Sequence, residues 1–360
     1  MSKDRITVSE IIEGIKPVDT VWVEKARKRT ARLVIPPRAL GRLHDISEQL
    51  CGIGKTLEPS IDRKAFLVMA GDHGVAAEGV SAFPQQVTGE MIRCFLMGGA
   101  GINILAGQAG ADVYVVDMGI IPDLDPLTLE GGERLHIEKI APGTQSFSQG
   151  PAMTLEQAKA SVIAGFKHAS ALLEAGTDIL GTGDMGIGNT TPSAAIGAVV
   201  TGASLDDMVG RGTGIDDSGL ILKKKIIQKG IEINRPMVHN GLDILAKIGG
   251  FEIGGIAGVI LAAAYHGKPV MIDGFISTAG ALIAQALCPE SVQYILAGHC
   301  SEEPGHRIML DHLGLRPILD LGMRLGEGTG GALAMNIVEG AIRIFRNMLT
   351  FDQAGVSEGA

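Results

Sequence analysis

The chain has 360 residues, enough for one large domain or two coupled ones, and 46% of them are hydrophobic. Its 31 Lys and Arg stand against 40 Asp and Glu, and the resulting net charge of −9 argues against non-specific nucleic-acid binding, which needs a basic face. The longest apolar run, Ile253 to Tyr265, is too short to cross a bilayer, and residues 1–16 contain no apolar core of a signal peptide.

The first 60 residues are predicted to be helical, because apolar residues recur at helical spacing in 8–15, 21–32 and 39–50. Further along, short apolar runs alternate with helical segments. The runs predict buried parallel strands at 65–70, 112–117, 177–180, 269–273, 294–297 and 317–320. The helical segments are 88–108, 155–175, 192–201, 218–234, 254–266 and 278–287. This alternation predicts an α/β fold with a parallel sheet, whose ligands bind beyond the carboxyl ends of the strands.

The last amphipathic helix, about 331–348, is expected to pack on the N-terminal helices. The sequence therefore predicts a small helical domain from residues 1–60 and about 331–350, a large α/β domain over about 61–330, and a frayed tail at 351–360. The polar segment 122–151 is predicted to be a loop.

Cysteine usage indicates a reducing compartment. The four cysteines are scattered and form no Cys-x-x-Cys pair, which disfavours a disulfide framework or a thiolate zinc site. We expect a cytoplasmic protein with neither a membrane nor a nucleic acid as partner. Glycine, at 51 residues, occurs at roughly twice its average usage, which indicates many tight turns where backbone approaches backbone or ligand.

A glycine-rich stretch at 181–193 follows a predicted strand and precedes a predicted helix. Gly181, Gly183 and Gly186 match G-x-G-x-x-G, and Asp206 stands at the distance of a ribose-binding acid. The segment after Gly188 is unlike the apolar helix start of a dinucleotide fold. Phosphate binding is therefore favoured over dinucleotide binding, and a purely structural turn is the other alternative.

A second glycine-rich loop, 210–219, precedes a helix that carries Lys223, Lys224 and Lys225. The loop could close on the same phosphate. Three consecutive lysines usually form a solvated helix face, so we expect at most one of them to point inward.

Two further loops carry polar residues after predicted strands. In 71–85, Asp72 and His73 lack further ligands at metal spacing, so this loop is expected to shape an apolar pocket. In 298–306, Ser301 is predicted to cap a helix that begins with Glu302, Glu303 and Pro304. A Cys300–His299 nucleophile pair is disfavoured, because adjacent residues on an extended segment point apart.

Glu327 is a single carboxylate between glycines, ahead of an apolar helix. It could simply offset the helix dipole. Burial would raise its pKa toward that of a useful general base, so a catalytic role is the alternative. The 271–280 segment carries one acid, Asp273, rather than the paired acids that bind ribose and Mg²⁺ in enzymes using phosphoribosyl pyrophosphate. This argues for a donor that needs no metal.

Together, these motifs resemble the nicotinate-nucleotide–dimethylbenzimidazole phosphoribosyltransferase family of cobalamin lower-ligand synthesis. The stretches that carry the resemblance run in family order and cover most of the chain: 70–89, 181–195, 210–217, 273–281, 298–306 and 319–334. The resemblance implies a Rossmann-like parallel sheet flanked by helices, a small helical domain from both termini and a homodimer. It also implies transfer of phosphoribosyl from nicotinate mononucleotide to 5,6-dimethylbenzimidazole with inversion at C1′, giving α-ribazole 5′-phosphate and nicotinate, without metal or cofactor.

The resemblance also implies roles for individual residues. Glu327 is the base, and Asp184 is a helper at a position where the family can carry the longer Glu. The phosphate and ribose are assigned to Gly186, Asn189, Gly212, Thr213, Lys223 and Asp273. The acceptor base is assigned to Ser81, Phe83, Pro84, Gln85, Met185, Met323 and Leu325, and the nicotinate side to Ser301.

Three alternatives stay open at this point. The acceptor could be adenine, benzimidazole or a phenol. A nucleotide-binding oxidoreductase would use the 181–186 glycines, although no residue set for hydride transfer is evident. A non-catalytic nucleotide sensor would need the pocket but not Glu327.

Overall fold

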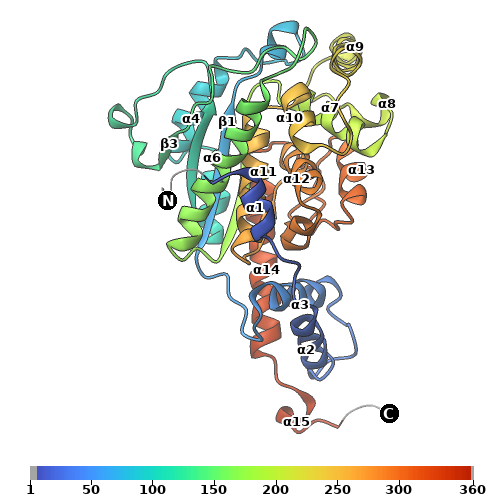
Figure 1. The fold of residues 1–360 in the computed structure, drawn as a ribbon. Helices are drawn as coiled ribbons and strands as arrows, with labels where there is room; N and C mark the ends of the chain where they lie inside the picture. The colour runs from blue at the N-terminus through green and yellow to red at the C-terminus, as the bar shows by residue number, and fades with distance from the viewer. Residues whose placement is uncertain (1–5, 358–360) are drawn as a thin grey trace.

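The computed structural model describes residues 6–357 and contains one six-stranded sheet in which every pairing is parallel (Figure 1). The strand order is β3-β2-β1-β4-β5-β6. The strands are β1 Lys64–Gly71, β2 Ala111–Gly119, β3 Leu135–Ile137, β4 Ile179–Met185, β5 Val270–Ile272 and β6 Ile295–Ala297. The predicted parallel α/β architecture is confirmed, and its strand order is that of a doubly wound Rossmann-type sheet.

The sheet is buried on both faces, as the continuous apolar run of β1 requires. Leu67 and Met69 pack into the core on one face, whereas Phe66 and Val68 belong to the core on the other. The first face is covered by α6 (Leu155–Glu174) and α11 (Phe251–Tyr265). The second is covered by α4 (Val87–Leu96), α5 (Gly101–Ala109) and part of α14 (Thr329–Asn347). The two-residue alternation of a strand thus serves two separate hydrophobic cores.

The other helices are α1 Val8–Gly14, α2 Thr20–Thr30, α3 Arg42–Gly54, α7 Thr190–Thr201, α8 Leu205–Met208, α9 Asp217–Asn234, α10 Gly241–Ile248, α12 Phe275–Leu287, α13 Gly305–His312 and α15 Phe351–Ala354. Short 3₁₀ segments occupy Gly74–Glu78, Pro126–Thr128, Gly132–Arg134 and Pro289–Tyr294.

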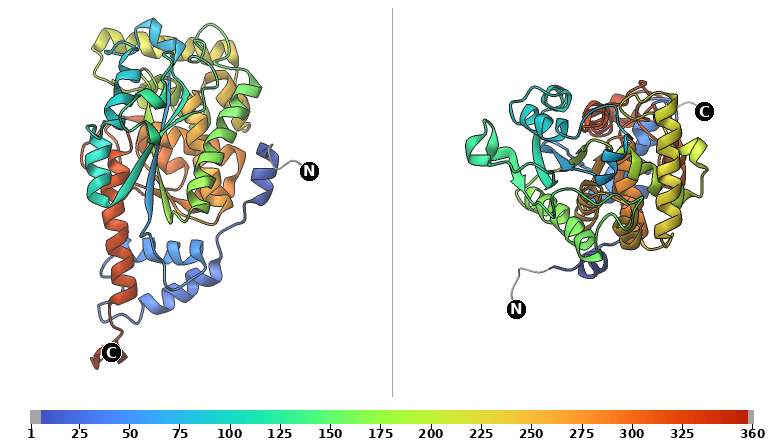
Figure 2. Two further views of the ribbon diagram at one scale, coloured as in Figure 1. Left: turned by 90° about the vertical axis from the view of Figure 1, so that its left-hand side faces the viewer. Right: turned by 90° about the horizontal axis from the view of Figure 1, so that it is seen from above.

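A small helical cluster lies beyond the amino ends of the strands. Helix α14 starts beside the sheet and runs down to α2 and α3 (Figure 2, left). Ala26, Cys51 and Phe345, one from each helix, form its core. The isolated antiparallel bridge between Leu33 and Thr350 joins the two chain ends. Segments from near both ends of the described chain therefore pack together in this cluster.

Helix α1 does not join that cluster but packs on α11 and α6 of the large unit. In this respect the packing differs from the expected 1–60 domain, whose helical part in the structure is α2 and α3. Residues 1–5 of that expected domain and 358–360 of the expected tail lie outside the described residues.

Several predicted elements need correction. The helix expected over 88–108 is two helices, because Gly98 adopts φ +77° and breaks the run. The strand expected at 317–320 is only a single parallel bridge between His299 and Leu319. The loop expected over 122–151 contains β3. In the tail, Thr350 caps the short helix α15. Within residues 6–357, no helix is long and apolar enough to span a membrane.

Candidate active site

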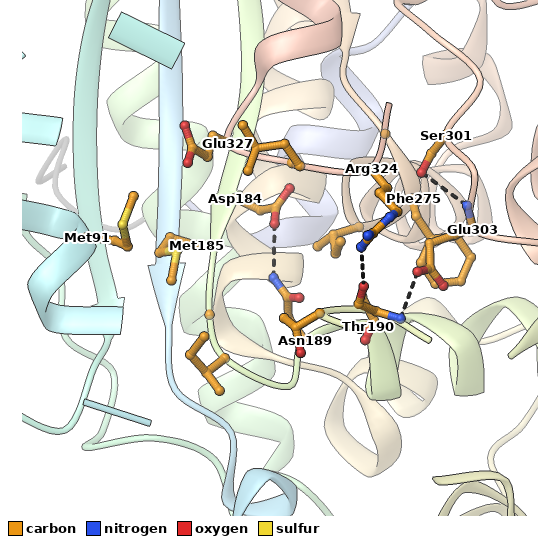
Figure 3. A pocket seen from close by; sticks show the side chains of 18 of the residues that line it. Met91, Asp184, Met185, Asn189, Thr190, Phe275, Ser301, Glu303, Arg324 and Glu327 are labelled. Carbon is orange, nitrogen blue, oxygen red and sulfur yellow. Dashed lines mark hydrogen bonds between the residues drawn. The ribbon is translucent and has the colours of Figure 1, made fainter. Parts of the chain in front are cut away.

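A cavity of about 420 Å³ opens at the carboxyl ends of β4, β5 and β6, beside the point where the strand order reverses between β1 and β4. Doubly wound folds bind ligands at this place. The cavity is lined by Phe83, Val87, Met91, Asp184, Met185, Gly186, Ile187, Asn189, Thr190, Gly212, Thr213, Gly274, Phe275, Ile276, His299, Ser301, Glu303, Arg324, Leu325, Gly326 and Glu327. Figure 3 shows an apolar side with Met91 and Met185, and a polar side with Ser301, Glu303 and Arg324.

Two of the three glycines in the 181–186 pattern lie in a strand and not in a loop. Gly181 and Gly183 lie inside β4, where a Cβ would collide with the ring of Phe66 and with the carbonyl oxygen of Glu327, respectively. Only Gly186 lies in the turn after the strand. Asp206, the acid that a dinucleotide fold would need, lies on α8 and pairs with Lys224. The dinucleotide-fold interpretation is therefore wrong.

Glu327 lies in the cavity wall, 6% exposed, with a left-handed φ of +65°. Its Oε2 accepts a hydrogen bond from the main-chain N–H of Ile102 at 3.0 Å, at the start of α5. Burial raises the pKa of Glu327, the Ile102 N–H opposes that rise, and the negative charge of Asp273 adds to it. This carboxylate is thus fixed in place and prefers a proton more than an exposed glutamate does.

Asp184, the penultimate residue of β4, lines the same cavity as Glu327. Its Oδ2 accepts a hydrogen bond from Asn189 Nδ2 at 3.0 Å (Figure 3), whereas its Oδ1 has no partner within residues 6–357. Burial, and then the charge of Asp273, hold the pKa of Asp184 well above its usual value.

Asp273 itself lies behind the cavity and does not line it. It accepts hydrogen bonds from the N–H groups of Gly328, at 3.1 Å, and Gly331, at 3.0 Å, and so organises the start of α14. His299 Nε2 lies 3.5 Å from its Oδ1. Burial raises the pKa of Asp273, and His299 partly offsets the rise.

The polar side of the cavity is built on the 210–214 loop. The Gly212 N–H donates to Glu303 Oε1 at 2.9 Å, and the Gly212 carbonyl accepts from Arg324 Nη1 at 3.1 Å. Of the three consecutive lysines, only Lys223 is fully buried, in agreement with the expectation that at most one points inward. Its Nζ donates to Thr190 Oγ1 at 2.7 Å and to the Gly210 carbonyl at 3.3 Å, and burial lowers its pKa to about 8.

Ten of the predicted site residues line this one cavity: Glu327, Asp184, Gly186, Asn189, Gly212, Thr213, Phe83, Met185, Leu325 and Ser301. Six others do not line it: Lys223, Asp273, Ser81, Pro84, Gln85 and Met323. Ser81 contacts the rim, because its hydroxyl lies 3.1 Å from Thr213 Oγ1. Gln85 turns away and donates to the carbonyl of His73 at 3.1 Å.

The sequence reasoning missed lining residues that stand inside stretches it had quoted. Thr190 follows Asn189, Phe275 lies in 273–281, and Arg324 lies between two predicted contacts. Val87 and Met91 are one helical turn apart on α4, so the apolar spacing of that helix was the available signal.

The 298–306 loop also differs from its prediction. Helix α13 begins at Gly305, so Ser301 does not cap it, although Ser301 Oγ accepts from the Glu303 N–H at 3.3 Å. The N–H of Ser301 donates to His306 Nδ1 at 2.8 Å, which fixes the loop. Burial raises the pKa of the Cys300 thiol, which speaks against a nucleophilic role as expected. No group of three or more His, Cys, Asp or Glu in the described chain could hold a metal ion.

A doubly wound α/β sheet whose cavity at the switch point combines glycine turns with a fixed, buried carboxylate is typical of a nucleotide-processing enzyme of the group-transfer class. A family model described as phosphoribosyltransferase matches residues 15–356. Nicotinate-nucleotide–dimethylbenzimidazole phosphoribosyltransferases from two bacteria are similar over nearly their full length. The one from Syntrophotalea carbinolica is 54% identical over 348 residues, covering 97% of this chain and 98% of that protein. The one from Desulforamulus reducens is 51% identical over 354 residues, covering 98% and 99%.

A solved structure agrees. The crystal structure of the nicotinate-nucleotide–dimethylbenzimidazole phosphoribosyltransferase from Thermus thermophilus superposes with a TM-score of 0.88 at 42% identity, covering 95% of this chain and 100% of that one. The chain therefore belongs to the nicotinate-nucleotide–dimethylbenzimidazole phosphoribosyltransferase family, and the resemblance stated from its motifs is confirmed.

Proposed function

We propose that this chain transfers the phosphoribosyl group of nicotinate mononucleotide to 5,6-dimethylbenzimidazole, in cobalamin nucleotide assembly. Family membership supports the reaction. The observation that carries the site assignment is the position of Glu327, a single buried carboxylate held against Ile102 in the wall of a cavity with one apolar and one polar side.

The reaction needs one general base and no further group to activate the leaving nicotinate. The bond between C1′ and the cationic ring nitrogen of the donor breaks, and its electron pair goes to that nitrogen, so nicotinate leaves with a neutral pyridine ring. One ring nitrogen of the acceptor attacks C1′ from the opposite face, which inverts β to α. The other ring nitrogen gives its proton to Glu327. Placing base and acceptor together in a mostly apolar enclosure supplies orientation as well as proton transfer.

The acceptor base is assigned to the apolar side, where Phe83, Val87, Met91 and Met185 stand near Glu327. Its planar ring would gain affinity by displacing water from these side chains. Met323 and Leu325 belong to the loop that carries Glu327, and Ser81 holds Thr213 at the rim.

The donor is assigned to the polar side. Gly186, Asn189, Gly212 and Thr213 would surround its phosphoribosyl group, and Ser301 would face nicotinate. Lys223 would act from behind the loop through Thr190 rather than by touching the phosphate. Asp273 would act in the same indirect way, by fixing the Glu327 loop through Gly328.

The identity of the acceptor follows from shape more than from hydrogen bonding, because the residues on the apolar side offer few polar groups. Leu325, 61% exposed, and Phe83, 53% exposed, form the rim of the cavity. A chemically related planar base, such as adenine or benzimidazole, is therefore the second candidate acceptor for the same reaction.

A homodimer is part of the proposal. It is supported by large apolar side chains on the surface of the helices beside the apolar side of the cavity, Met97 at 62% and Ile104 at 65% exposure. Light scattering on the purified protein tests the homodimer. The mass of a monomer at micromolar protein concentration would contradict it.

The activity is tested by incubating the protein with nicotinate mononucleotide and single bases in the presence of EDTA. Chromatography measures nicotinate release. The coupling of H1′ to H2′ in the proton magnetic resonance spectrum gives the configuration of the product at C1′. The proposal expects stoichiometric nicotinate and α-nucleotide with dimethylbenzimidazole. Release of nicotinate with no base present, or a β-product, would contradict the inverting transfer.

A further inference from the structure

His299 is a buried basic side chain of the cavity wall that the proposed transfer does not use. It lies two residues after β6 and is 1% exposed. It lines the cavity, yet both of its ring nitrogens are buried, and neither has a hydrogen-bond partner in the part of the chain that the structure describes. Because buried polar groups are nearly always satisfied, an unsatisfied one beside an active site indicates a functional constraint.

The ring of His299 is fixed between Asp273 and the first turn of α14. Its Nε2 lies 3.5 Å from Asp273 Oδ1. A Cβ at Gly330 would lie 2.0 Å from Cδ2 of the ring, so only a glycine lets the helix start come this close. The main chain beside the ring is also held, because the Cys300 N–H donates to the Leu319 carbonyl at 2.8 Å. The ring is therefore a fixed contact between the end of a strand and the start of a helix.

Asp273 connects this ring to the base of the transfer. Its two oxygens accept from the N–H groups of Gly328, at 3.1 Å, and Gly331, at 3.0 Å, and Gly328 directly follows Glu327. His299 is the one basic side chain of the described residues that pairs with this carboxylate. Burial raises the pKa of Asp273, and His299 opposes the rise. His299 therefore favours the ionised carboxylate, which can accept at both oxygens.

We propose that His299 is a positioning residue for the transfer: through Asp273 it holds the Gly328–Gly331 turn in the place that aims Glu327 at the acceptor. This assignment rests on the proposed function. A direct contact between His299 and a substrate is the alternative, and it is disfavoured because both ring nitrogens are buried and Nε2 faces Asp273. Small displacements of a catalytic group are costly in rate, so His299 should affect turnover much more than binding.

The test measures nicotinate release by the wild-type protein and by His299→Asn and His299→Gln, with nicotinate mononucleotide and dimethylbenzimidazole. Asparagine is too short to reach Asp273, whereas glutamine can place an amide N–H close to the position of Nε2. His312→Asn is the matched control, because His312 is exposed on α13 and does not line the cavity. Melting temperatures establish which variants fold. Asp273→Asn, which keeps one acceptor oxygen and loses the other, reaches the same turn by a second route.

We expect His299→Asn to lower kcat by about 10- to 100-fold, with KM for both substrates within about 3-fold of wild type. Asp273→Asn should show the same pattern, His299→Gln should recover part of the lost rate, and His312→Asn should match wild type. The decisive comparison is made in a Glu327→Gln background. Residue 327 can no longer receive the proton there, so His299→Asn should lower the residual rate by less than about a further 2-fold.

A loss of rate as large in the Glu327→Gln background as in the wild-type background would overturn the proposal, because His299 would then act on a substrate and not through the base. A change confined to KM would overturn it as well. Hydrogen exchange of the peptide that contains Gly328–Gly331 needs no turnover, and it should be faster in His299→Asn but not in His312→Asn. If wild-type protein binds both substrates yet transfers nothing, the proposed function fails, whereas unchanged exchange in His299→Asn would overturn the assignment of His299.

Discussion

The carboxylate of Glu327 accepts a hydrogen bond from the main-chain N–H of Ile102, with 3.0 Å between oxygen and nitrogen, although 225 positions separate the two residues in the chain. Ile102 lies in the first turn of α5, where main-chain N–H groups lack partners within their own helix. The start of one helix therefore anchors the carboxylate that precedes another helix, α14. This contact favours the ionised form of Glu327, against the effect of burial.

A methyl group at Gly101 should disturb the base without unfolding the protein. A Cβ there would lie 2.9 Å from Leu325 Cδ2 and 3.2 Å from Glu327 Oε2. We expect Gly101→Ala to lower kcat by roughly 10-fold or more, because small displacements of a catalytic group are costly. Gly107→Ala on the same helix is the control, since no atom lies within 4 Å of its Cβ position. Equal kcat values for the two variants would show that the Gly101 contact is irrelevant.

The pH dependence of transfer should have an acid limb set by Glu327. Burial raises the pKa of Glu327, the Ile102 N–H lowers it by less, and the charge of Asp273 raises it further. A base must be ionised, so kcat/KM should fall as the pH drops through a value above the ordinary glutamate pKa. Two acceptors of different ring basicity serve as the control. A limb that moves with the acceptor's own pKa would reflect protonation of the acceptor instead.

The ionised carboxylate of Asp184 should lower the stability of the folded protein at neutral pH. Burial, then the charge of Asp273, raise the pKa of Asp184 in the folded state. A raised carboxyl pKa contributes stability that is present below the unfolded pKa, about 3.9, and is lost as the pH rises through the folded value. We therefore expect Asp184→Asn to melt at or above the wild-type temperature at pH 7, with the difference vanishing near pH 4.

Exposed Asp206 provides a control for that experiment, because its pKa is shifted in the opposite direction to that of Asp184. Its hydrogen bond and ion pair with Lys224 lower its pKa, so Asp206→Asn should leave the melting temperature unchanged or slightly lower at pH 7. A larger loss of stability for Asp184→Asn at pH 7 than at pH 4 would contradict the account of Asp184.

A buried ion pair supports the floor of the cavity. His73 Nε2 lies 2.8 Å from Glu252 Oε1, both side chains are fully buried, and a Cβ at Gly186 would lie 3.3 Å from that nitrogen. Removing one partner of such a pair costs about 3–5 kcal/mol, so Glu252→Gln should lower the free energy of unfolding by that amount. Urea titration measures it, and Glu156→Gln, at an exposed pair with Lys159, should cost less than about 1 kcal/mol.

The same pair should make stability depend on pH. Burial lowers the pKa of His73, but the charge of Glu252 and its contact with the ring outweigh this effect and raise it. The stabilisation is complete below the unfolded histidine pKa, about 6.5, and is lost as the pH rises through the folded value. The gap between wild-type and Glu252→Gln protein should therefore narrow at alkaline pH, and a gap that widens would contradict the pairing.

The fold was largely predictable wherever the local pattern was strong. Strand β1 is a continuous apolar run between two cores, and α6 has a capping box at Thr154 and Gln157 together with helical periodicity. Strand β3 could not be predicted from the sequence. Leu135–Ile137 is only three residues long, and it forms a strand because it pairs in parallel with β2. Likewise, the run at 317–320 is apolar enough for a strand but finds only one bridge, which depends on the path of the 298–306 loop.

The site was predictable where one segment carried the information. Glu327 is the one carboxylate between glycines ahead of an apolar helix. Lys223 has helical spacing to Ile226, Ile227 and Gly230 on the buried face of α9, and this spacing indicates from the sequence that its side chain points inward. Arg324 and Glu303 were not, because their places in the cavity depend on contacts with Gly212, about 90 to 110 positions away. Contacts of that kind follow from tertiary structure rather than from any local pattern.

The central claim is that Glu327 is the base of the transfer, and a single-turnover experiment with Glu327→Gln tests it most directly. Glutamine keeps the side-chain shape and can still accept from the Ile102 N–H, but it cannot receive the acceptor's proton. With saturating nicotinate mononucleotide and dimethylbenzimidazole, the account predicts wild-type affinity for both substrates and a rate of nicotinate release that falls by about 10²- to 10⁴-fold. A release rate within a few fold of wild type, in a variant that binds both substrates, would contradict it.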